Sequence, residues 1–170
     1  MRRTLLTDTS LIVTWMTEAH GKIKTVAKGA RRMKSPFAGK LDLFFHAEIT
    51  FYRSKKSELH VLREVVLREP FEGLRKSYLR TQLAAYFVEL IDLVTEPEHP
   101  APELYELLLR ALTYLANGEP DKRALLHFEN ELARLLGIQG QQSEITAAVA
   151  IGRAYNDLPS SRPALLKRLS

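Results

Sequence analysis

A run of positive charge between residues 21 and 40 is the part of the sequence best equipped for chemistry. The segment has no Asp or Glu, and its seven Lys and Arg residues are Lys22, Lys24, Lys28, Arg31, Arg32, Lys34 and Lys40. A strip of cations suits the regularly spaced phosphates of a nucleic-acid backbone, and interspersed glycines let the protein backbone approach closely. The segment is therefore predicted to bind nucleic acid through its phosphates.

Solubility is the alternative explanation of this basic segment, because exposed charge also keeps proteins apart in solution. Charges that serve only solubility are usually mixed in sign. Here no acidic residue lies between Glu18 and Asp42. The one-sided charge favours binding to a polyanion over a general effect on solubility.

The charge of the whole chain is divided unevenly along the sequence. The net charge is +5, with +9 in residues 1–80 and −4 in residues 81–170. This division predicts one region for a polyanionic partner and a second region with another task. Cysteine is absent, which excludes disulfides and thiolate metal sites. A chain without cysteine fits the reducing environment of a cytoplasmic location.

Residues before about position 70 alternate between apolar and polar side chains, which is the pattern of β-strands. Strands are expected at residues 11–16, 22–28, 41–52 and 59–67. Short strands joined by turns that contain Gly and Ser are typical of a small barrel of the OB type. Residues 1–70 are accordingly predicted to form an OB-fold domain that binds nucleic acid.

The alternation also assigns side chains to the faces of the last two expected strands. In residues 41–52 it places Phe44 and Tyr52 on the polar face, where both are candidates for stacking on bases. The alternative is that these rings pack against other parts of the chain, as most aromatic side chains do. In residues 59–67 the alternation places His60 on the polar face.

Residues after Pro70 repeat their apolar side chains every three or four positions, which is the pattern of helices. Helices are expected at residues 79–94, 102–115, 120–135 and 143–155, with a loop at Gln139–Gln142 and a short helical turn at residues 164–169. Residues 71–170 are predicted to form an α-helical bundle domain. The fold class is therefore α+β, an OB-fold β-barrel followed by a helical bundle.

The sequence lacks the motifs that usually carry catalysis or hold a metal. It contains neither GxxxxGK[ST] nor GxGxxG, and its five histidines are not spaced as metal ligands. Two carboxylate pairs, Glu89/Asp92 and Glu129/Glu131, fall in helical runs and are interpreted as solvated helix faces. The residues thus predict no enzymatic activity, no cofactor and no metal site.

Several segments of the chain resemble the RecO family of bacterial recombination mediators. They are residues 10–14 (SLIVT), 17–22 (TEAHGK), 26–32 (VAKGARR), 34–35 (KS), 37–39 (FAG), 62–64 (LRE), 71–75 (FEGLR), 104–112 (LYELLLRAL) and 128–137. The resemblance covers roughly residues 4–137, and VAKGARR is its most specific part.

The resemblance implies an OB-fold and a helical domain that bind single- and double-stranded DNA and anneal complementary strands. It also implies contact with RecR and with the C-terminal tail of single-stranded DNA-binding protein. Together with RecR, such a protein would help to load RecA on single strands coated by single-stranded DNA-binding protein, without nucleotide hydrolysis. Carried over by position, the residues that contact DNA are Lys22, Lys24, Lys28, Arg31, Arg32 and Lys34.

Three features depart from the family pattern. Many members have a four-cysteine zinc module after the third helix, whereas here Gly137 continues without cysteine, so no zinc site of that kind is expected. The chain is shorter than usual at its C-terminal end, which predicts a reduced helical domain. The family's first strand normally begins before the residue that matches Arg3 or Thr4. Two explanations are open: the barrel lacks part of its first strand, or the start of the sequence is misassigned. A lost first strand would leave an unpaired barrel edge.

Two other functions remain open from the sequence alone. One is an interaction adaptor, in which the basic barrel receives acidic protein tails and binds DNA weakly or not at all. The other is an RNA-binding barrel, because contacts to the backbone alone distinguish RNA from DNA poorly. DNA binding that strengthens with oligonucleotide length and weakens with salt would exclude the adaptor.

Overall fold

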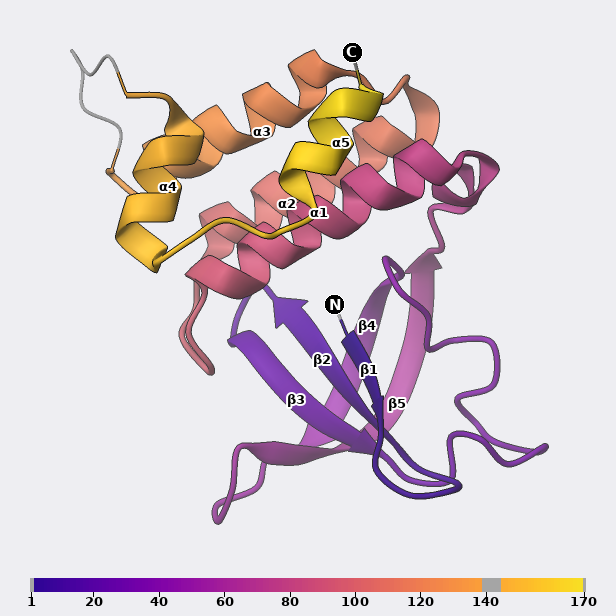
Figure 1. The fold of residues 1–170 in the computed structure, drawn as a ribbon. Helices are drawn as coiled ribbons and strands as arrows, with labels where there is room; N and C mark the ends of the chain where they lie inside the picture. The colour runs from indigo at the N-terminus through magenta and orange to yellow at the C-terminus, as the bar shows by residue number, and fades with distance from the viewer. Residues whose placement is uncertain (1, 139–144, 170) are drawn as a thin grey trace. The chain divides into compact units, whose positions relative to one another are not determined.

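The structure is a computed structural model, and it describes residues 2–138 and 145–169. Along the described chain, strands come first and helices follow (Figure 1). The chain divides into two compact units. The barrel unit comprises residues Met1–Phe71 and Thr95–Pro102, and the helical unit comprises Glu72–Val94 and Glu103–Ser170. The fold is thus α+β, as the sequence predicts.

The barrel unit is built on one five-stranded sheet. Its strands are β1 (Arg2–Leu5), β2 (Leu11–Thr17), β3 (Gly21–Ala27), β4 (His46–Tyr52) and β5 (Leu59–Glu69). Their order is β1-β2-β3-β5-β4, with β3 parallel to β5 and the other pairs antiparallel. This arrangement is consistent with the predicted OB-fold. β1 pairs with β2 along its length, from Arg2 opposite Thr14 to Leu5 opposite Leu11.

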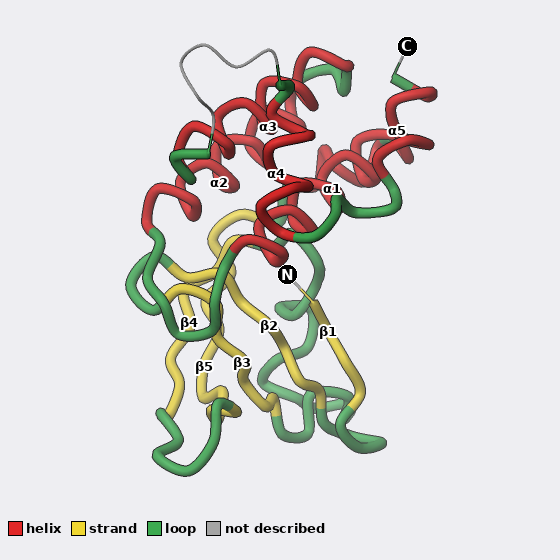
Figure 2. The backbone as a smooth tube through the Cα atoms, turned by 60° about the vertical axis from the view of Figure 1, so that its left-hand side comes forward, coloured by secondary structure: helices red, strands yellow, loops and turns green. Residues whose placement is uncertain are grey.

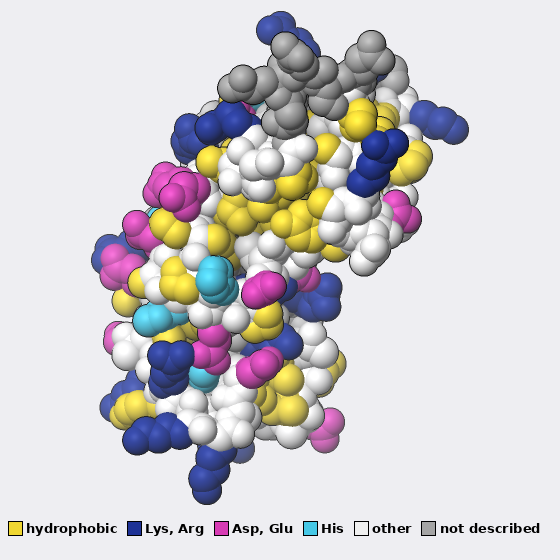
Figure 3. All heavy atoms as spheres, turned by 90° about the vertical axis from the view of Figure 1, so that its left-hand side faces the viewer, with side chains coloured by type: hydrophobic (Ala, Val, Ile, Leu, Met, Phe, Trp, Pro, Cys, Tyr) yellow, Lys and Arg dark blue, Asp and Glu magenta, His cyan; other side chains and the backbone are white. Residues whose placement is uncertain are grey.

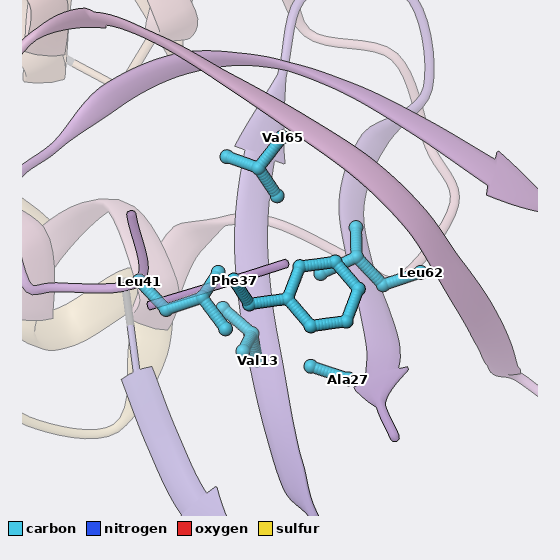
Figure 4. Packing of buried hydrophobic residues seen from close by; sticks show 6 residues of the cluster. All are labelled: Val13, Ala27, Phe37, Leu41, Leu62 and Val65. Carbon is cyan, nitrogen blue, oxygen red and sulfur yellow. The ribbon is translucent and has the colours of Figure 1, made fainter. Parts of the chain in front are cut away.

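The core of the barrel unit includes side chains from the loop that follows β3. Along β3, Ile23, Thr25 and Ala27 are buried while Lys24 is exposed, as the alternation predicts, but Val26 on the Lys24 face is buried as well. The cluster around Ala27 comprises Val13, Ala27, Phe37, Leu41, Leu62 and Val65. Figure 4 shows the Phe37 ring lying among these side chains. Two apolar residues of the loop, Phe37 and Leu41, are therefore anchored in the barrel.

The strand predicted at residues 41–52 begins only at His46. The preceding residues form a turn, in which Phe44 has a left-handed backbone with φ 67°. Leu41 is drawn into the core, and Asp42 forms an ion pair of 3.0 Å with Arg3 of β1. The alternating pattern thus continues through a segment that is not a strand. The prediction that Phe44 and Tyr52 share a strand face is wrong.

An irregularity in β5 changes which side chains are buried. The register shifts between Thr50, opposite Glu64, and Phe51, opposite Leu62, so that Arg63 is an extra residue. The predicted position of His60 on a polar face is wrong, because its side chain is only 1% exposed. The His60 ring stacks on Phe51 at 5.2 Å, and its Nδ1 accepts a hydrogen bond from the Ser54 N–H.

The connection between the first two long helices belongs to the barrel unit. In this connection the Glu98 N–H donates to the carbonyl of Lys22 (2.9 Å), and the Glu98 carboxylate forms an ion pair with Arg53. At the start of β3, Gly21 has φ 64°, and a Cβ there would clash with the carbonyl oxygen of His99. Glycine is therefore required where the connection meets β3.

The helical unit contains a short 3-10 helix and five α-helices in its described part. These are η1 (Glu72–Lys76), α1 (Tyr78–Val94), α2 (Pro102–Asn117), α3 (Lys122–Leu135), α4 (Ala147–Tyr155) and α5 (Arg162–Arg168). The predicted helices are confirmed, except that the fourth starts at Ala147, after the N-cap Thr146. Its expected start at Ser143 and the expected loop at Gln139–Gln142 lie outside the described residues. Among the described helices, none has the length and apolar character needed to cross a membrane.

Candidate nucleic-acid interface

The loop after β3 is held against the loop between β1 and β2. We call residues 28–40 the basic loop. The backbone N–H of Arg31 donates to the carbonyl of Thr9 (3.0 Å), and its guanidinium donates to the carbonyl of Asp8 (3.1 Å). The N–H of Gly29 donates to Ser10 Oγ (3.3 Å). The β1–β2 loop is one of the two loops with which OB barrels bind oligonucleotides, so the fold brings the basic loop beside a recurrent ligand site.

Successive turns direct the cations of the basic loop outward. Gly29 has φ 66°, a conformation that favours glycine. The N–H of Arg32 donates to the carbonyl of Gly29, and that of Ser35 to the carbonyl of Arg32, both at 3.0 Å. Between these turns, residues 31–34 are all exposed, and Met33 is 100% exposed. The tip of the basic loop is therefore a set of cations around one apolar side chain.

The structure places the seven predicted cations in four positions. Lys28, Arg31, Arg32 and Lys34 lie together in the first part of the basic loop, and all are exposed. Lys24 is exposed on β3, opposite Thr14 of β2. Lys22 is half-buried at the other end of β3, about 20 Å from Lys28 for a strand that rises ~3.3 Å per residue. Lys40 lies at the far end of the basic loop and is half-buried.

Most of these cations have no acidic partner. Within residues 2–138 and 145–169, Lys24, Lys28, Arg32, Lys34 and Lys40 form no ion pair with a carboxylate. Elsewhere in the barrel unit, by contrast, three arginines are paired with carboxylates, namely Arg3 with Asp42, Arg53 with Glu98 and Arg68 with Glu48. The hydrogen bond from Arg68 lowers the pKa of Glu48. The basic segment thus leaves its charge available to an external anion.

A groove of about 500 Å³ lies beside the far end of the basic loop. Its lining residues are Pro36, Phe37, Lys40, Tyr52, Val61, Leu62, Arg63, Glu64 and Val65. Of the two aromatic residues proposed for base stacking, Tyr52 lines this groove and is 59% exposed, whereas Phe44 is half-buried and does not line it. The groove also contains Arg63, which the sequence did not indicate because only the bulge in β5 brings it there.

Two further lysines lie in the turn between β4 and β5, the second loop that OB barrels use for ligands. Lys55 and Lys56 are exposed, and the Ser54 side chain accepts hydrogen bonds from the N–H groups of Lys56 and Ser57 (3.2 Å each). Figure 2 shows this turn and the β1–β2 loop at the lower end of the barrel unit. In Figure 3, Lys and Arg side chains gather around the lower end of that unit. Two adjacent lysines between the strands expected at residues 41–52 and 59–67 are the signal that could have identified Lys55 and Lys56.

The helical unit contains a separate pocket of about 650 Å³. Its lining residues are Phe87, Leu107, Arg110, Ala111, Tyr114, Asp121, Arg123, Ala124, His127 and Phe128. The rings of Phe87 and Phe128 are stacked 4.0 Å apart. The pocket therefore combines apolar walls with three basic side chains, Arg110, Arg123 and His127, and one carboxylate, Asp121. In residues 2–138 and 145–169 no three His, Asp or Glu side chains are grouped in a way that could hold a metal ion.

The prediction that Glu129 lies on a solvated helix face is wrong. Its side chain is 1% exposed and accepts hydrogen bonds from the Arg162 guanidinium (2.6 and 2.8 Å) and from the Tyr86 hydroxyl (2.5 Å). Burial and the Glu129 carboxylate raise the pKa of Tyr86 far above its usual range. Its helical neighbour Glu131 pairs with Arg134 instead (2.9 Å). The two carboxylates thus have separate partners, and Glu129 links α3 to α1 and α5.

Sequence comparisons connect both units to one family. A family model described as "Recombination protein O N terminal" matches residues 1–71, and one described as "Recombination protein O C terminal" matches residues 75–147. Curated relatives include proteins named "DNA repair protein RecO". The one from Rhodopirellula baltica is 36% identical over 137 residues, which are 81% of this chain and 51% of the relative.

Two more relatives with the same name show similar values. The protein from Syntrophus aciditrophicus is 35% identical over 130 residues, which are 76% of this chain and 50% of the relative. The protein from Bacillus subtilis is 32% identical over 143 residues, which are 84% of this chain and 54% of the relative. The chain therefore spans about half the length of the curated relatives it matches.

Proposed function

Because the chain belongs to the RecO family, we propose that its barrel unit binds single- and double-stranded DNA and anneals complementary strands. The observation that supports this most is the group of exposed cations in residues 24–34. None of these cations has a carboxylate partner in the described chain, and the Arg31 guanidinium donates to the backbone carbonyl of Asp8. Lys22 and Lys40 extend the proposed contact along β3 and to the far end of the basic loop.

Annealing by this surface is an electrostatic process in which no bond is broken. Two DNA strands repel each other because each carries a negative charge on every phosphate. Cations that neutralise some of these phosphates release condensed counterions and reduce the repulsion, so that complementary bases can meet. By family membership, we propose that the same activity serves RecA loading together with RecR, at the bacterial nucleoid.

A charge-reversal variant tests this proposal. Lys28→Glu, Arg31→Glu and Arg32→Glu combined should weaken binding of labelled single-stranded DNA by about 100-fold or more, because cations that face phosphates become anions. Fluorescence titration measures the affinity, and pairing of complementary oligonucleotides measures annealing. The control combines Lys122→Glu, Arg134→Glu and Arg153→Glu, three exposed cations of the helical unit. Unchanged DNA affinity in a correctly folded triple variant of the basic loop would contradict the proposal.

The pocket of the helical unit supports a second proposal, that it binds the C-terminal tail of single-stranded DNA-binding protein. Its apolar walls around Phe87 and Phe128 suit apolar side chains, and Arg110, Arg123 and His127 suit carboxylates. Fluorescence anisotropy of a labelled tail peptide should show weaker binding to Arg123→Glu and unchanged binding to the charge-reversed basic loop. The reverse result would favour the adaptor, in which the basic barrel receives acidic tails.

A further inference from the structure

The groove beside the bulge of β5 brings an aromatic ring, two cations and a carboxylate into one place. One wall is formed by residues 36–40 of the basic loop, and the other by Tyr52 and residues 61–65. The first wall is fixed because the Phe37 ring is only 6% exposed within the barrel core (Figure 4). The volume of about 500 Å³ lies within the range of pockets that hold small organic ligands.

Tyr52 and Arg63 form an exposed cation–π pair at this groove. Tyr52 is the last residue of β4, and the Arg63 guanidinium lies 5.2 Å from the centroid of its ring. The bulge accounts for this position, because an extra residue leaves Arg63 and Glu64 exposed in succession while Leu62 and Val65 on either side are buried. Nucleobases stack on exposed aromatic rings and on guanidinium planes.

The charged groups of the groove are complementary to the parts of a nucleotide. Lys40 carries a positive charge with no carboxylate partner in the described chain, and it suits a phosphate. Glu64, on the opposite wall, repels phosphates but accepts hydrogen bonds from base amino groups. The phosphate of a nucleotide is thus favoured on the Lys40 side of the groove, and its base on the Glu64 side.

We propose that this groove holds one unpaired nucleotide of a DNA strand, with its base against Tyr52 and Arg63 and its phosphate at Lys40. The proposal rests on the DNA binding proposed above and adds a contact that intact duplex DNA cannot make. In a duplex the faces of the bases are stacked on each other, so a base must leave the stack before it can enter the groove. The groove therefore favours single strands.

Paired oligonucleotides with and without bases test the subsite. An abasic strand of equal length keeps the phosphates but offers nothing to stack, so the wild-type chain should bind an oligodeoxycytidine about tenfold or more tightly than the abasic strand. Tyr52→Ala and Arg63→Ala should each reduce this ratio, and Tyr52→Phe should preserve it. Tyr78→Ala is a matched control, because Tyr78 of α1 is 72% exposed and carries the Arg168 guanidinium 5.7 Å from its ring centroid.

The outcomes separate this subsite from DNA binding itself. If Tyr52→Ala leaves the affinity ratio between the two strands unchanged, the subsite proposal is wrong. DNA binding through the basic loop still stands in that case if the charge-reversed variant has lost affinity for both strands. An equal loss of affinity for both strands in Tyr52→Ala overturns it too, because stacking acts only on the strand with bases. If the wild-type chain binds neither strand, both proposals fail.

Discussion

The cations of the basic loop and those of the helical unit have different surroundings. In the basic loop Lys28, Arg32 and Lys34 are exposed and have no carboxylate partner in the described chain. In the helical unit Arg80, Arg134 and Arg162 each meet a carboxylate, at 3.1, 2.9 and 2.6 Å. The barrel unit contains 14 Lys and Arg against nine Asp and Glu, whereas the helical unit contains 11 of each. The helical unit thus has equal numbers of basic and acidic residues and pairs three of its arginines internally, whereas these basic-loop cations are available to a partner.

Removal of a buried carboxylate from the helical unit is the largest change that this comparison predicts. Glu129→Ala should lower the free energy of unfolding by about 3–5 kcal/mol, because it leaves the Arg162 guanidinium without its carboxylate and the Tyr86 hydroxyl without its acceptor. Chemical denaturation measures the loss. Glu131→Ala is the control, because its ion pair with Arg134 lies at the surface and such pairs contribute at most ~1 kcal/mol.

The same comparison predicts that Glu129→Ala does not affect DNA binding. Under conditions in which Glu129→Ala is still folded, its affinity for single-stranded DNA should equal that of the wild-type chain. A large loss of affinity without loss of stability would show that the buried ion pair serves binding, against the distinction drawn between the two sets of cations.

Truncation of Phe37, which anchors the basic loop in the barrel core, should affect stability and DNA binding together. Phe37→Ala should cost about 3 kcal/mol, at the low end for a buried Phe because a loop can relax around the cavity. It should also weaken DNA binding, since the basic loop loses one of its attachments to the barrel unit. Met33→Ala changes a fully exposed side chain four residues away and should leave the melting temperature unchanged. Equal melting temperatures for both variants would contradict the anchoring role of Phe37.

The elements could be predicted where one periodic pattern covers one regular element. The alternation of Ile23, Lys24 and Thr25 was enough to place β3 and its exposed face. The same reasoning failed at Phe44, because alternation continued through a turn that the burial of Leu41 and the ion pair of Asp42 stabilise. Contacts between distant segments decide such cases, and a local pattern does not contain them.

The candidate site shows the same limit. The cations of the basic loop were visible as a run of charge, but Arg63 enters the groove only through a bulge that alternation cannot reveal. Glu129 had a usable signal, because it lies four residues after Leu125 and three before Leu132, on the apolar face of α3. Its partner Arg162 is 33 residues further on, so the ion pair could not be inferred. The charge count that divided the chain at residue 80 likewise assigned Glu96 and Glu98 to the second region, although both belong to the barrel unit.

A pH dependence of stability should arise from the helical unit at alkaline pH. Because the pKa of Tyr86 is raised in the folded state, unfolding releases its proton above the unfolded pKa of about 10. The stability contributed by this group is therefore complete below about pH 10 and falls as pH rises above it, by at most about 1.4 kcal/mol per pH unit. Denaturation between pH 8 and pH 11 (a range of about three units around the phenol pKa) should show a smaller fall for Tyr86→Phe. A fall equal to that of the wild-type chain would contradict this.

The salt dependence of DNA binding tests most directly whether the free cations of the basic loop bind phosphates. For single strands the slope of log affinity against log salt is about −0.7 per neutralised phosphate, so loss of three contacts should make it shallower by about 2. The variant Lys28→Glu, Arg31→Glu, Arg32→Glu should show this change, and the variant Lys122→Glu, Arg134→Glu, Arg153→Glu should keep the wild-type slope. Equal slopes for all three proteins, or equal flattening in both variants, would contradict the assignment of DNA binding to the basic loop.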